Sequence, residues 1–333
     1  LVDRQFGVVA GTDTTSRGFE NHGTAVIGVV SGDVNGYGIT GIAADAQIGA
    51  SSFVGQSTAT AIVKAAQQLS AGDLLIIEVH RAGPNATGNG QFGYIAIEWW
   101  PDDFAAIRYA INKGIIVCEA AGNGYQNLDA AVYNTPAQGF PPTWRNPFNV
   151  ANPSSGAVVV GAGAPPPGTH GRDHGPDRSR LAFSNYGTRV DAQGWGREVT
   201  TAGYGDLQGG SDANNNFAAR NRWYTDTFSG TSSATPIVTG ALTATQGVLK
   251  AQGSPLLSPA TARNLLRTTG SPQQDAPGRP ATQRIGNRPD LKQMIGTVAK
   301  VWHYFKTVQT SYVVTTSKAV WINVSDLGWR RIH

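Results

Sequence analysis

The sequence predicts an α/β protein built on a parallel β-sheet with helices on both faces. Strand-like apolar runs alternate with helical segments along most of the chain, which is the order expected of a parallel sheet. The chain has 333 residues, of which 40% are hydrophobic. It can therefore bury a full core, either as one large domain or as two modest ones.

Each expected strand is a short, continuous apolar run, as a strand covered on both faces requires. These strands cover residues 6–10, 46–54, 74–80, 115–120 and 157–160. In such sheets ligands bind at the carboxyl ends of the strands. Asn123 and the segment 80–83 follow two of these strands, so both are candidates for a site.

The expected helices lie between and after these strands. One is expected to start at His22 and to continue through an apolar stretch, and the others cover 59–69, 102–113 and 231–252. The last helix carries Pro236 within its first turn, where a missing N–H breaks no hydrogen bond.

The composition indicates a compact, loop-rich, extracytoplasmic type of protein, because only 14% of residues are charged while Gly numbers 42 and Pro 18. The net charge is +4 and the basic residues are scattered, so no nucleic acid partner is expected. No run of 18 apolar residues exists, so no membrane span is expected. Cys118, the sole cysteine, lies in an apolar run and is expected to be buried rather than reactive.

Ser232 is the first candidate for chemistry. It lies at the start of the helix 231–252, where free N–H groups and the positive end of the helix dipole favour negative charge on its Oγ. Gly230, Ser233 and Ala234 leave room for a substrate backbone. Taken alone, this segment fits either a nucleophile or a helix-capping serine, because serine caps helices for the same reasons.

A serine nucleophile needs an adjacent base, which is usually a histidine. Among the six histidines, His22 stands out because its predicted place at a helix N-terminus would lower its pKa and keep it neutral. A structural capping role is the alternative. Asn123 lies between two glycines after the strand 115–120, where its amide could face a developing oxyanion. The alternative is an ordinary turn asparagine.

Together these segments resemble the subtilisin-like serine proteases (subtilases). The matching motifs are His-Gly-Thr at 22–24, Ala-Ala-Gly-Asn at 120–123 and Gly-Thr-Ser-x-Ala-x-Pro at 230–236, in the family's order. Weaker similarities occur at 38–43 and 183–187. The resemblance implies a subtilisin-like peptidase domain over 1–297. Residues 298–333 are expected to be a linker and the start of a truncated β-type module, with β-structure at 312–324.

The resemblance also implies a serine endopeptidase that acts on protein or peptide substrates. Ser232 would be the nucleophile, His22 the general base and then acid, and Asn123 an oxyanion donor together with the Ser232 backbone N–H. The family's usual Ser-Leu-Gly-Gly is replaced here by His80, Arg81, Ala82 and Gly83, which would hold the substrate backbone. This departure leaves the cleavage preference open: Arg81 either favours an acidic side chain or is a solvated residue of the cleft rim.

The triad carboxylate has no clear candidate. In subtilases it is an Asp at the end of a parallel strand that precedes the histidine. Asp3 has only Leu1 and Val2 before it, and Asp13 lies only nine residues before His22, which is too close for the usual connection. We expect the Asp and its strand to precede Leu1, so that this chain is an N-terminally truncated piece. A catalytically inactive binding protein of the same fold is the alternative.

A third interpretation is an esterase of the α/β-hydrolase class. The Gly-x-Ser-x-Gly signature of that class requires a glycine where this chain has Ala234. The catalytic histidine of that class follows the serine in the chain, so only His303 and His333 could take its role. This alternative is disfavoured.

No cofactor and no metal site are assigned. His170 and His174 would need a helix and further ligands, and Gly171 argues against a helix. Calcium as a structural ion is left open, with oxygen ligands available at 206–216, where a polar turn is the favoured interpretation. The resemblance implies a secreted or extracytoplasmic protein, although no signal peptide is visible, and we expect a monomer.

Overall fold

The computed structural model describes residues 5–209, 220, 222–298, 320–325 and 328–332. Its centre is a four-stranded parallel sheet in the order β3-β6-β7-β8. These strands cover Leu74–Ile77, Ile116–Ala120, Val158–Gly163 and Ala192–Trp195. The parallel pairing follows from their connections, which cross over from one end of the sheet to the other.

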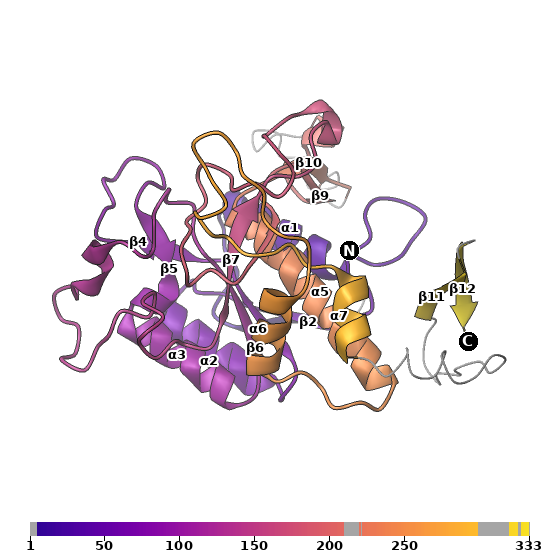
Figure 1. Cartoon of the computed structure of the whole chain (residues 1–333). Coiled ribbons are helices and arrows are strands. Elements are labelled where there is room, and N and C mark those ends of the chain that lie inside the picture. The colour runs from indigo at the N-terminus through magenta and orange to yellow at the C-terminus, as the bar shows by residue number, and fades with distance from the viewer. Residues whose placement is uncertain (1–4, 210–219, 221, 299–319, 326–327, 333) are drawn as a thin grey trace.

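Helices cover both faces of this sheet, as predicted (Figure 1). Ile116 and Cys118 of β6 pack in one core with α5, α6 and α7, whereas Val117 packs in a second core with α2 and α3. This alternation is the period of two that a strand buried on both faces shows. The helices are α2 (Thr58–Gln68), α3 (Pro101–Asn112), α5 (Thr231–Ala251), α6 (Pro259–Thr268) and α7 (Leu291–Val298).

Three smaller sheets surround the central one. β1 (Gln5–Ala10) pairs in parallel with β2 (Ile48–Ser51), β4 (His80–Ala82) pairs antiparallel with β5 (Tyr94–Ala96), and β9 (Val199–Ala202) pairs antiparallel with β10 (Tyr224–Phe228). Short 3₁₀ turns lie at Ile97–Trp99 (η1), Ala131–Asn134 (η2), Thr169–Gly171 (η3) and Asp206–Gln208 (η4). A further hairpin joins β11 (Val320–Ser325) to β12 (Gly328–Ile332).

The first helix, α1 (Arg17–Ser31), buries Ala25, Val26 and Val29 against Val199 and Phe228. It starts well before His22, so our expectation that the helix begins at His22 was wrong. Ser16 occupies the N-cap position and Glu20 lies in the first turn, where the positive end of the helix favours an acidic side chain. His22 therefore lies past the first turn.

The other predicted helices and strands are found with shifted ends, except that one strand is interrupted. The expected strand 74–80 is interrupted: β3 ends at Ile77, and the chain then enters β4 at His80, which belongs to another sheet. Part of the expected β-structure at 312–324 is found as β11, while 312–319 lie outside the described residues. The proposed domain boundary near 297 remains a prediction.

Candidate active site

His22, Asn123 and Ser232 come from three separate elements and line one cavity of about 3330 Å³. His22 is on α1, Asn123 follows the carboxyl end of β6, and Ser232 lies in the first turn of α5. A site at the carboxyl ends of parallel strands is the position that such sheets favour. The structure thus brings together the three residues that the sequence singled out at widely separated positions.

The backbone at Gly230 sets the position of Ser232. Gly230 is the N-cap of α5 with a φ of 98°, a conformation that side-chain-bearing residues rarely adopt. A Cβ there would also come within 3.2 Å of the Asn123 amide nitrogen. The glycine therefore lets the chain turn sharply into α5 while Asn123 lies close by, and Ser232 follows in the first turn.

Asn123 is fixed by the residue that precedes the candidate nucleophile. Its Oδ1 accepts hydrogen bonds from the Thr231 backbone N–H at 2.8 Å and from the Thr231 hydroxyl at 2.9 Å. Two donors on one oxygen determine which end of the amide is the NH₂ group. The Nδ2 donates one of its two N–H groups to Gln91 Oε1 at 3.1 Å.

His22 is neutral for a reason other than the one expected. The sequence suggested a helix N-terminus as the cause, but the ring lies past the first turn of α1. Burial instead lowers the pKa of His22 below its usual range, because a low-dielectric site disfavours the imidazolium. The ring packs edge-on against Phe228 at 5.8 Å between centroids. Its apolar contact with Phe228 helps to hold the ring in the cleft.

His80 lies in the same cavity and contacts Asn123 rather than projecting toward solvent. Its Nδ1 accepts a hydrogen bond from the Asn123 backbone N–H at 3.2 Å, and its ring packs on Tyr94 at 4.9 Å. Burial, with a smaller contribution from His22, lowers the pKa of His80 to about 4. The low pKa favours a neutral His80, and the acceptor role of Nδ1 then places the ring proton on Nε2.

The other expected substrate-binding residues follow along β4. Arg81 pairs with Asp103 at 2.7 Å and with Asp102 at 3.5 Å, and its guanidinium lies over the Trp100 ring at 4.5 Å. Its charge is therefore already compensated within the protein. Ala82 is paired with Tyr94 of β5, and the Gly83 N–H donates to the Gly93 carbonyl at 3.0 Å. Within the part of the chain that is described, β4 has a strand on one edge only.

Glu78 is a residue of this site that the sequence analysis missed. It follows β3 directly, it lines the same cavity as Ser232, and both of its carboxyl oxygens are shielded from solvent without a hydrogen-bond partner of acceptable geometry. Burial raises the pKa of Glu78 well above its ordinary value, and the nearby Ser232 hydroxyl opposes that rise. The available signal was an acidic residue inside an otherwise apolar strand run.

None of the described carboxylates forms an ion pair with His22. Asp13 lies in the exposed loop between β1 and α1 and borders the cavity, but it has no contact of this kind with His22. Asp3 lies outside the described residues. Among the described residues, Asp13 therefore does not supply the orienting acid of a triad in this structure.

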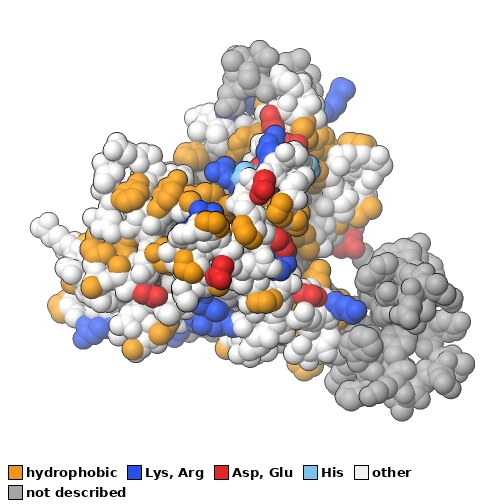
Figure 2. Space-filling model, turned by 45° about the horizontal axis from the view of Figure 1, so that its top comes forward, with side chains coloured by type: hydrophobic (Ala, Val, Ile, Leu, Met, Phe, Trp, Pro, Cys, Tyr) orange, Lys and Arg blue, Asp and Glu red, His pale blue; other side chains and the backbone are white. Residues whose placement is uncertain are grey.

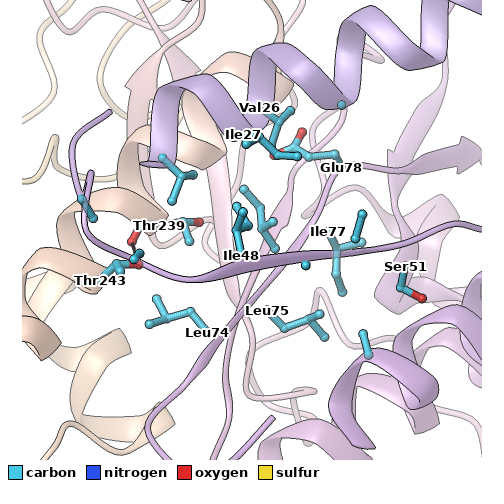
Figure 3. Close-up of a pocket in the computed structure, with 18 of the residues that line it drawn as sticks. Val26, Ile27, Ile48, Ser51, Leu74, Leu75, Ile77, Glu78, Thr239 and Thr243 are labelled. Atoms are coloured by element: carbon cyan, nitrogen blue, oxygen red, sulfur yellow. Dashed lines mark hydrogen bonds between the residues drawn. The ribbon is translucent and has the colours of Figure 1, made fainter. Parts of the chain in front are cut away.

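A long apolar groove extends from the site between β2 and β3 (Figure 3). Ile48 of β2 and Leu74, Leu75 and Ile77 of β3 line it, with Thr239 and Thr243 of α5 at one end. Glu78 lies near Val26 and Ile27 of α1 in the same view. In the described structure, β2 pairs only with β1, and β3 pairs only with β6. No described strand therefore lies between β2 and β3.

The other candidate clusters have structural partners. His174 Nε2 contacts Glu198 at 2.7 Å, and Arg172 joins Glu198 to Asp226. Among the described residues, no group of three or more His, Cys, Asp or Glu side chains is arranged to hold a metal ion, and residues 210–216 of the calcium segment 206–216 lie outside them. Cys118 is buried, and burial raises the pKa of its thiol to about 12, as expected of an unreactive core residue.

On the face shown in Figure 2, Lys and Arg side chains lie among acidic, polar and apolar ones. The expectation that the protein has no nucleic acid partner stays a prediction. No helix in the described part of the chain is long and apolar enough to cross a membrane.

Comparison with known proteins decides the family. A sequence model of the subtilase family matches residues 7–296. The chain belongs to the subtilase family. Subtilases are serine proteases, and this membership rules out the α/β-hydrolase alternative, whose histidines His303 and His333 lie outside the described residues. No curated protein matches the chain.

Solved structures show the same subtilisin-like fold. The patellamide maturation protease PatA is 18% identical with a TM-score of 0.56, and the match covers 89% of this subtilase and 97% of PatA. A cold adapted subtilisin-like serine proteinase is 22% identical with a TM-score of 0.51, and the match covers 86% of this chain and 82% of the proteinase. The epidermin leader peptide processing serine protease EpiP from Staphylococcus aureus is 22% identical with a TM-score of 0.52, and the match covers 84% of this chain and 63% of the EpiP chain.

Proposed function

We propose that this subtilase is a serine endopeptidase in which Ser232 attacks the peptide carbonyl. The observation that carries the proposal is the double hydrogen bond from Thr231 to Asn123, in the cavity that His22 also lines. This bond joins Asn123 to the residue that precedes Ser232, which supports a role for the Asn123 amide near the Ser232 hydroxyl. A hydrogen-bond donor held next to a nucleophile is what a developing oxyanion requires.

The proton path starts at the neutral His22. Its imidazole takes the Ser232 hydroxyl proton as Oγ bonds to the carbonyl carbon, and the resulting imidazolium gives that proton to the leaving amine. The Ser232 backbone N–H and the Asn123 Nδ2, through the N–H that Gln91 does not use, stabilise the oxyanion. Water then attacks the acyl-enzyme by the same steps, which restores Ser232.

The substrate backbone is proposed to pair with β4. His80, Arg81 and Ala82 form a strand with one occupied edge, and Gly83 continues it beside the site. An extended peptide can add to such an edge through main-chain hydrogen bonds, which bind many sequences. Since Arg81 is paired with Asp103 and stacked on Trp100, we assign it to holding β4 in place rather than to selecting an acidic side chain.

We further propose that a strand upstream of Leu1 fills the groove between β2 and β3 and carries the triad Asp. The support is the bare apolar edge of β3, whose sequence Leu-Leu-Ile-Ile is that of a central strand. A strand parallel to β3 would end near Glu78 and His22, because the carboxyl ends of parallel strands meet at one edge of the sheet.

Hydrogen exchange tests this strand. In the chain of 333 residues, backbone amides on the outer edge of β3 should exchange rapidly. In a chain extended by its natural upstream sequence, the same amides should be protected, while amides of β7 stay protected in both forms. Rapid exchange at β3 in the extended chain would contradict the proposal.

The alternative is a binding protein that keeps the cleft without hydrolysing peptides. Labelling by a fluorophosphonate probe distinguishes the two, with the extended natural chain and its Ser232→Ala and His22→Ala variants. We expect labelling that both substitutions abolish, together with cleavage of an unstructured protein substrate. A fully folded natural chain that neither labels nor cleaves would support the binding protein, and labelling that survives Ser232→Ala would show that another residue is the nucleophile.

Location and assembly are proposals that rest on the family. We propose a secreted or extracytoplasmic monomer, with calcium left open as a structural ion. Fractionation of the producing cells and light scattering of the purified chain test these two points.

A further inference from the structure

Asn185 is a buried asparagine whose side chain has no part in the proposed reaction. It lies in the segment 183–187, one of the two weaker similarities that the sequence shows to the family. Its exposed fraction is 0%. A buried side-chain amide without partners would be costly, so the hydrogen bonds that it makes indicate what it holds in place.

The side-chain amide of Asn185 makes four hydrogen bonds to the backbone. Its Oδ1 accepts from the N–H groups of Gly124 at 3.1 Å and Gln126 at 2.8 Å. Its Nδ2 donates to the carbonyls of Ala121 at 2.7 Å and Tyr94 at 2.8 Å. Two donors on the oxygen and two acceptors on the nitrogen satisfy the whole amide and determine which end is the NH₂ group.

These bonds lie on both sides of Asn123. Ala121 is two residues before it and Gly124 directly follows it, so one side chain fixes the backbone before and after the candidate oxyanion donor. The bond to Tyr94 adds β5, which pairs with the strand β4 proposed to hold the substrate. Each of the four partners therefore lies in the turn that carries Asn123 or on β5.

The backbone before Asn123 is shaped to admit the Asn185 amide. The Asn185 N–H donates to the Gly122 carbonyl at 3.1 Å, and Gly122 has a φ of 96°. A Cβ on Gly122 would come within 2.7 Å of the Asn185 Nδ2. The turn thus needs a glycine here both for its backbone conformation and for the space that the amide fills.

We propose that Asn185 is a positioning residue for Asn123, because it holds the turn 121–126 from which the oxyanion donor extends. This inference rests on the proposed function. Thr231 of α5 binds the side-chain oxygen of Asn123, whereas Asn185 fixes the backbone on either side of that residue. The donor is then held from both ends before substrate binds, which is the condition for electrostatic preorganisation.

A double-mutant cycle on the extended natural chain tests the proposal. Asn185→Ala should lower kcat on a peptide substrate about 10- to 100-fold with a smaller change in KM, because the turn and its amide lose their fixed position. In the Asn123→Ala background the same substitution should lower kcat by about twofold at most, because the group that it positions is already gone. An equal loss in both backgrounds would show that Asn185 supports the fold without acting through Asn123.

Asn146→Ala is the matched control. Asn146 is also a buried asparagine, but its amide binds the Asn134 side chain and the Phe148 N–H, neither of which belongs to the turn 121–126. This variant should lose stability while keeping the wild-type kcat at temperatures well below unfolding. A comparable loss of kcat in Asn146→Ala would show that kcat follows general loosening of the fold, which would overturn the assignment of Asn185.

Hydrogen exchange gives a second measurement that does not depend on activity. The Gly124 and Gln126 amides should be protected in the wild type and should exchange faster in Asn185→Ser, whose shorter side chain cannot keep both bonds. Amides of β7 should be equally protected in both proteins. Unchanged exchange at Gly124 and Gln126 would show that Asn185 does not hold this turn. Asn185→Ser also replaces Asn185→Ala in the cycle if the alanine variant does not fold.

The outcomes separate this inference from the proposed function. A kcat that falls in Asn123→Ala but not in Asn185→Ala would overturn the role of Asn185 and leave the protease function standing. A folded natural chain that neither labels with the fluorophosphonate probe nor cleaves peptides would overturn both.

Discussion

At the scale of single residues, the site is built from polar side chains that hold one another. Asn123 connects three of them: its amide oxygen binds Thr231, its amide nitrogen binds Gln91, and its backbone N–H binds His80. A turn asparagine would need none of these contacts. The network holds the amide in place before any substrate arrives, which is the condition for effective oxyanion stabilisation.

Replacing Asn123 should therefore affect chemistry more than binding. We expect Asn123→Ala to lower kcat by about 10²- to 10³-fold with little change in KM, because the amide donates to the oxyanion. Gln91→Ala is the control, since Gln91 contacts the same amide but has no proposed contact with the oxyanion. Steady-state kinetics on a peptide substrate measure both, and equal effects of the two substitutions would argue against the oxyanion role.

His80 should make the stability of the fold depend on pH. Its pKa in the folded protein is about 4, well below that of an unfolded histidine, so the unfolded chain binds a proton first as the pH falls. Stability is full above about pH 6.5 and decreases toward pH 4, by roughly 2 to 3 kcal/mol from this residue.

Urea unfolding at pH 7 and pH 4.5 measures this loss. Carboxylates also titrate in that range, so the informative quantity is the difference between the wild type and His80→Gln. The variant should lose less stability between the two pH values, and an equal loss in both proteins would show that His80 is not held neutral.

At the scale of elements, one turn connects β10 to the helix that carries the candidate nucleophile Ser232. β10 ends at Phe228, Gly230 turns the chain with a positive φ, and α5 begins at Thr231. The Gly230 N–H donates a hydrogen bond to the Gly196 carbonyl at 3.0 Å. The start of α5 is therefore fixed by its backbone before any side chain of the helix contributes.

Substitution of Gly230 should damage both stability and activity. We expect Gly230→Ala to cost about 1 to 3 kcal/mol from backbone strain and to reduce labelling of Ser232, since the new Cβ approaches Asn123. Gly247→Ala, at an exposed position of the same helix with no atom near its Cβ, should stabilise by about 0.5 to 1 kcal/mol. Thermal unfolding measures the stability of both variants. A similar change in stability at Gly230 and at Gly247 would contradict the prediction.

At the scale of the whole molecule, a buried ion network ties distant parts of the chain together. Arg189 is fully buried and contacts Glu98 of η1 at 2.6 Å and Asp191 at 2.8 Å. Asp191 precedes β8 and also binds Arg263 and Arg267 of α6. One carboxylate thus links the central sheet to α6.

Removing the central arginine should unfold this network. We expect Arg189→Ala to destabilise the protein by about 3 to 5 kcal/mol, because Glu98 and Asp191 lose their buried partner. Arg145→Ala, at an exposed arginine whose bonds go only to backbone carbonyls, should change stability by no more than about 0.5 kcal/mol. Chemical denaturation measures both, and a small effect at Arg189 would show that water replaces its contacts.

The sequence by itself determined the fold class, most of the elements and the three candidate residues of the reaction. These are local properties: a run of apolar residues specifies a buried strand, and the motifs at His22, Asn123 and Ser232 are each contained in a few neighbouring residues. The start of α1 and the break between β3 and β4 were missed, because Ser16 is a cap without a side-chain bond and because pairing of His80 with Ala96 is a long-range contact.

Only the tertiary structure decided which side chains share the cavity. Glu78 and Ser232 are far apart in the chain, as are His80 and Asn123, and no local pattern specifies that they meet. The groove between β2 and β3 is likewise a property of strand order, which depends on how the sheets pack. Periodicity within one segment fixes the type of an element, whereas contacts between segments depend on the packing of the whole core.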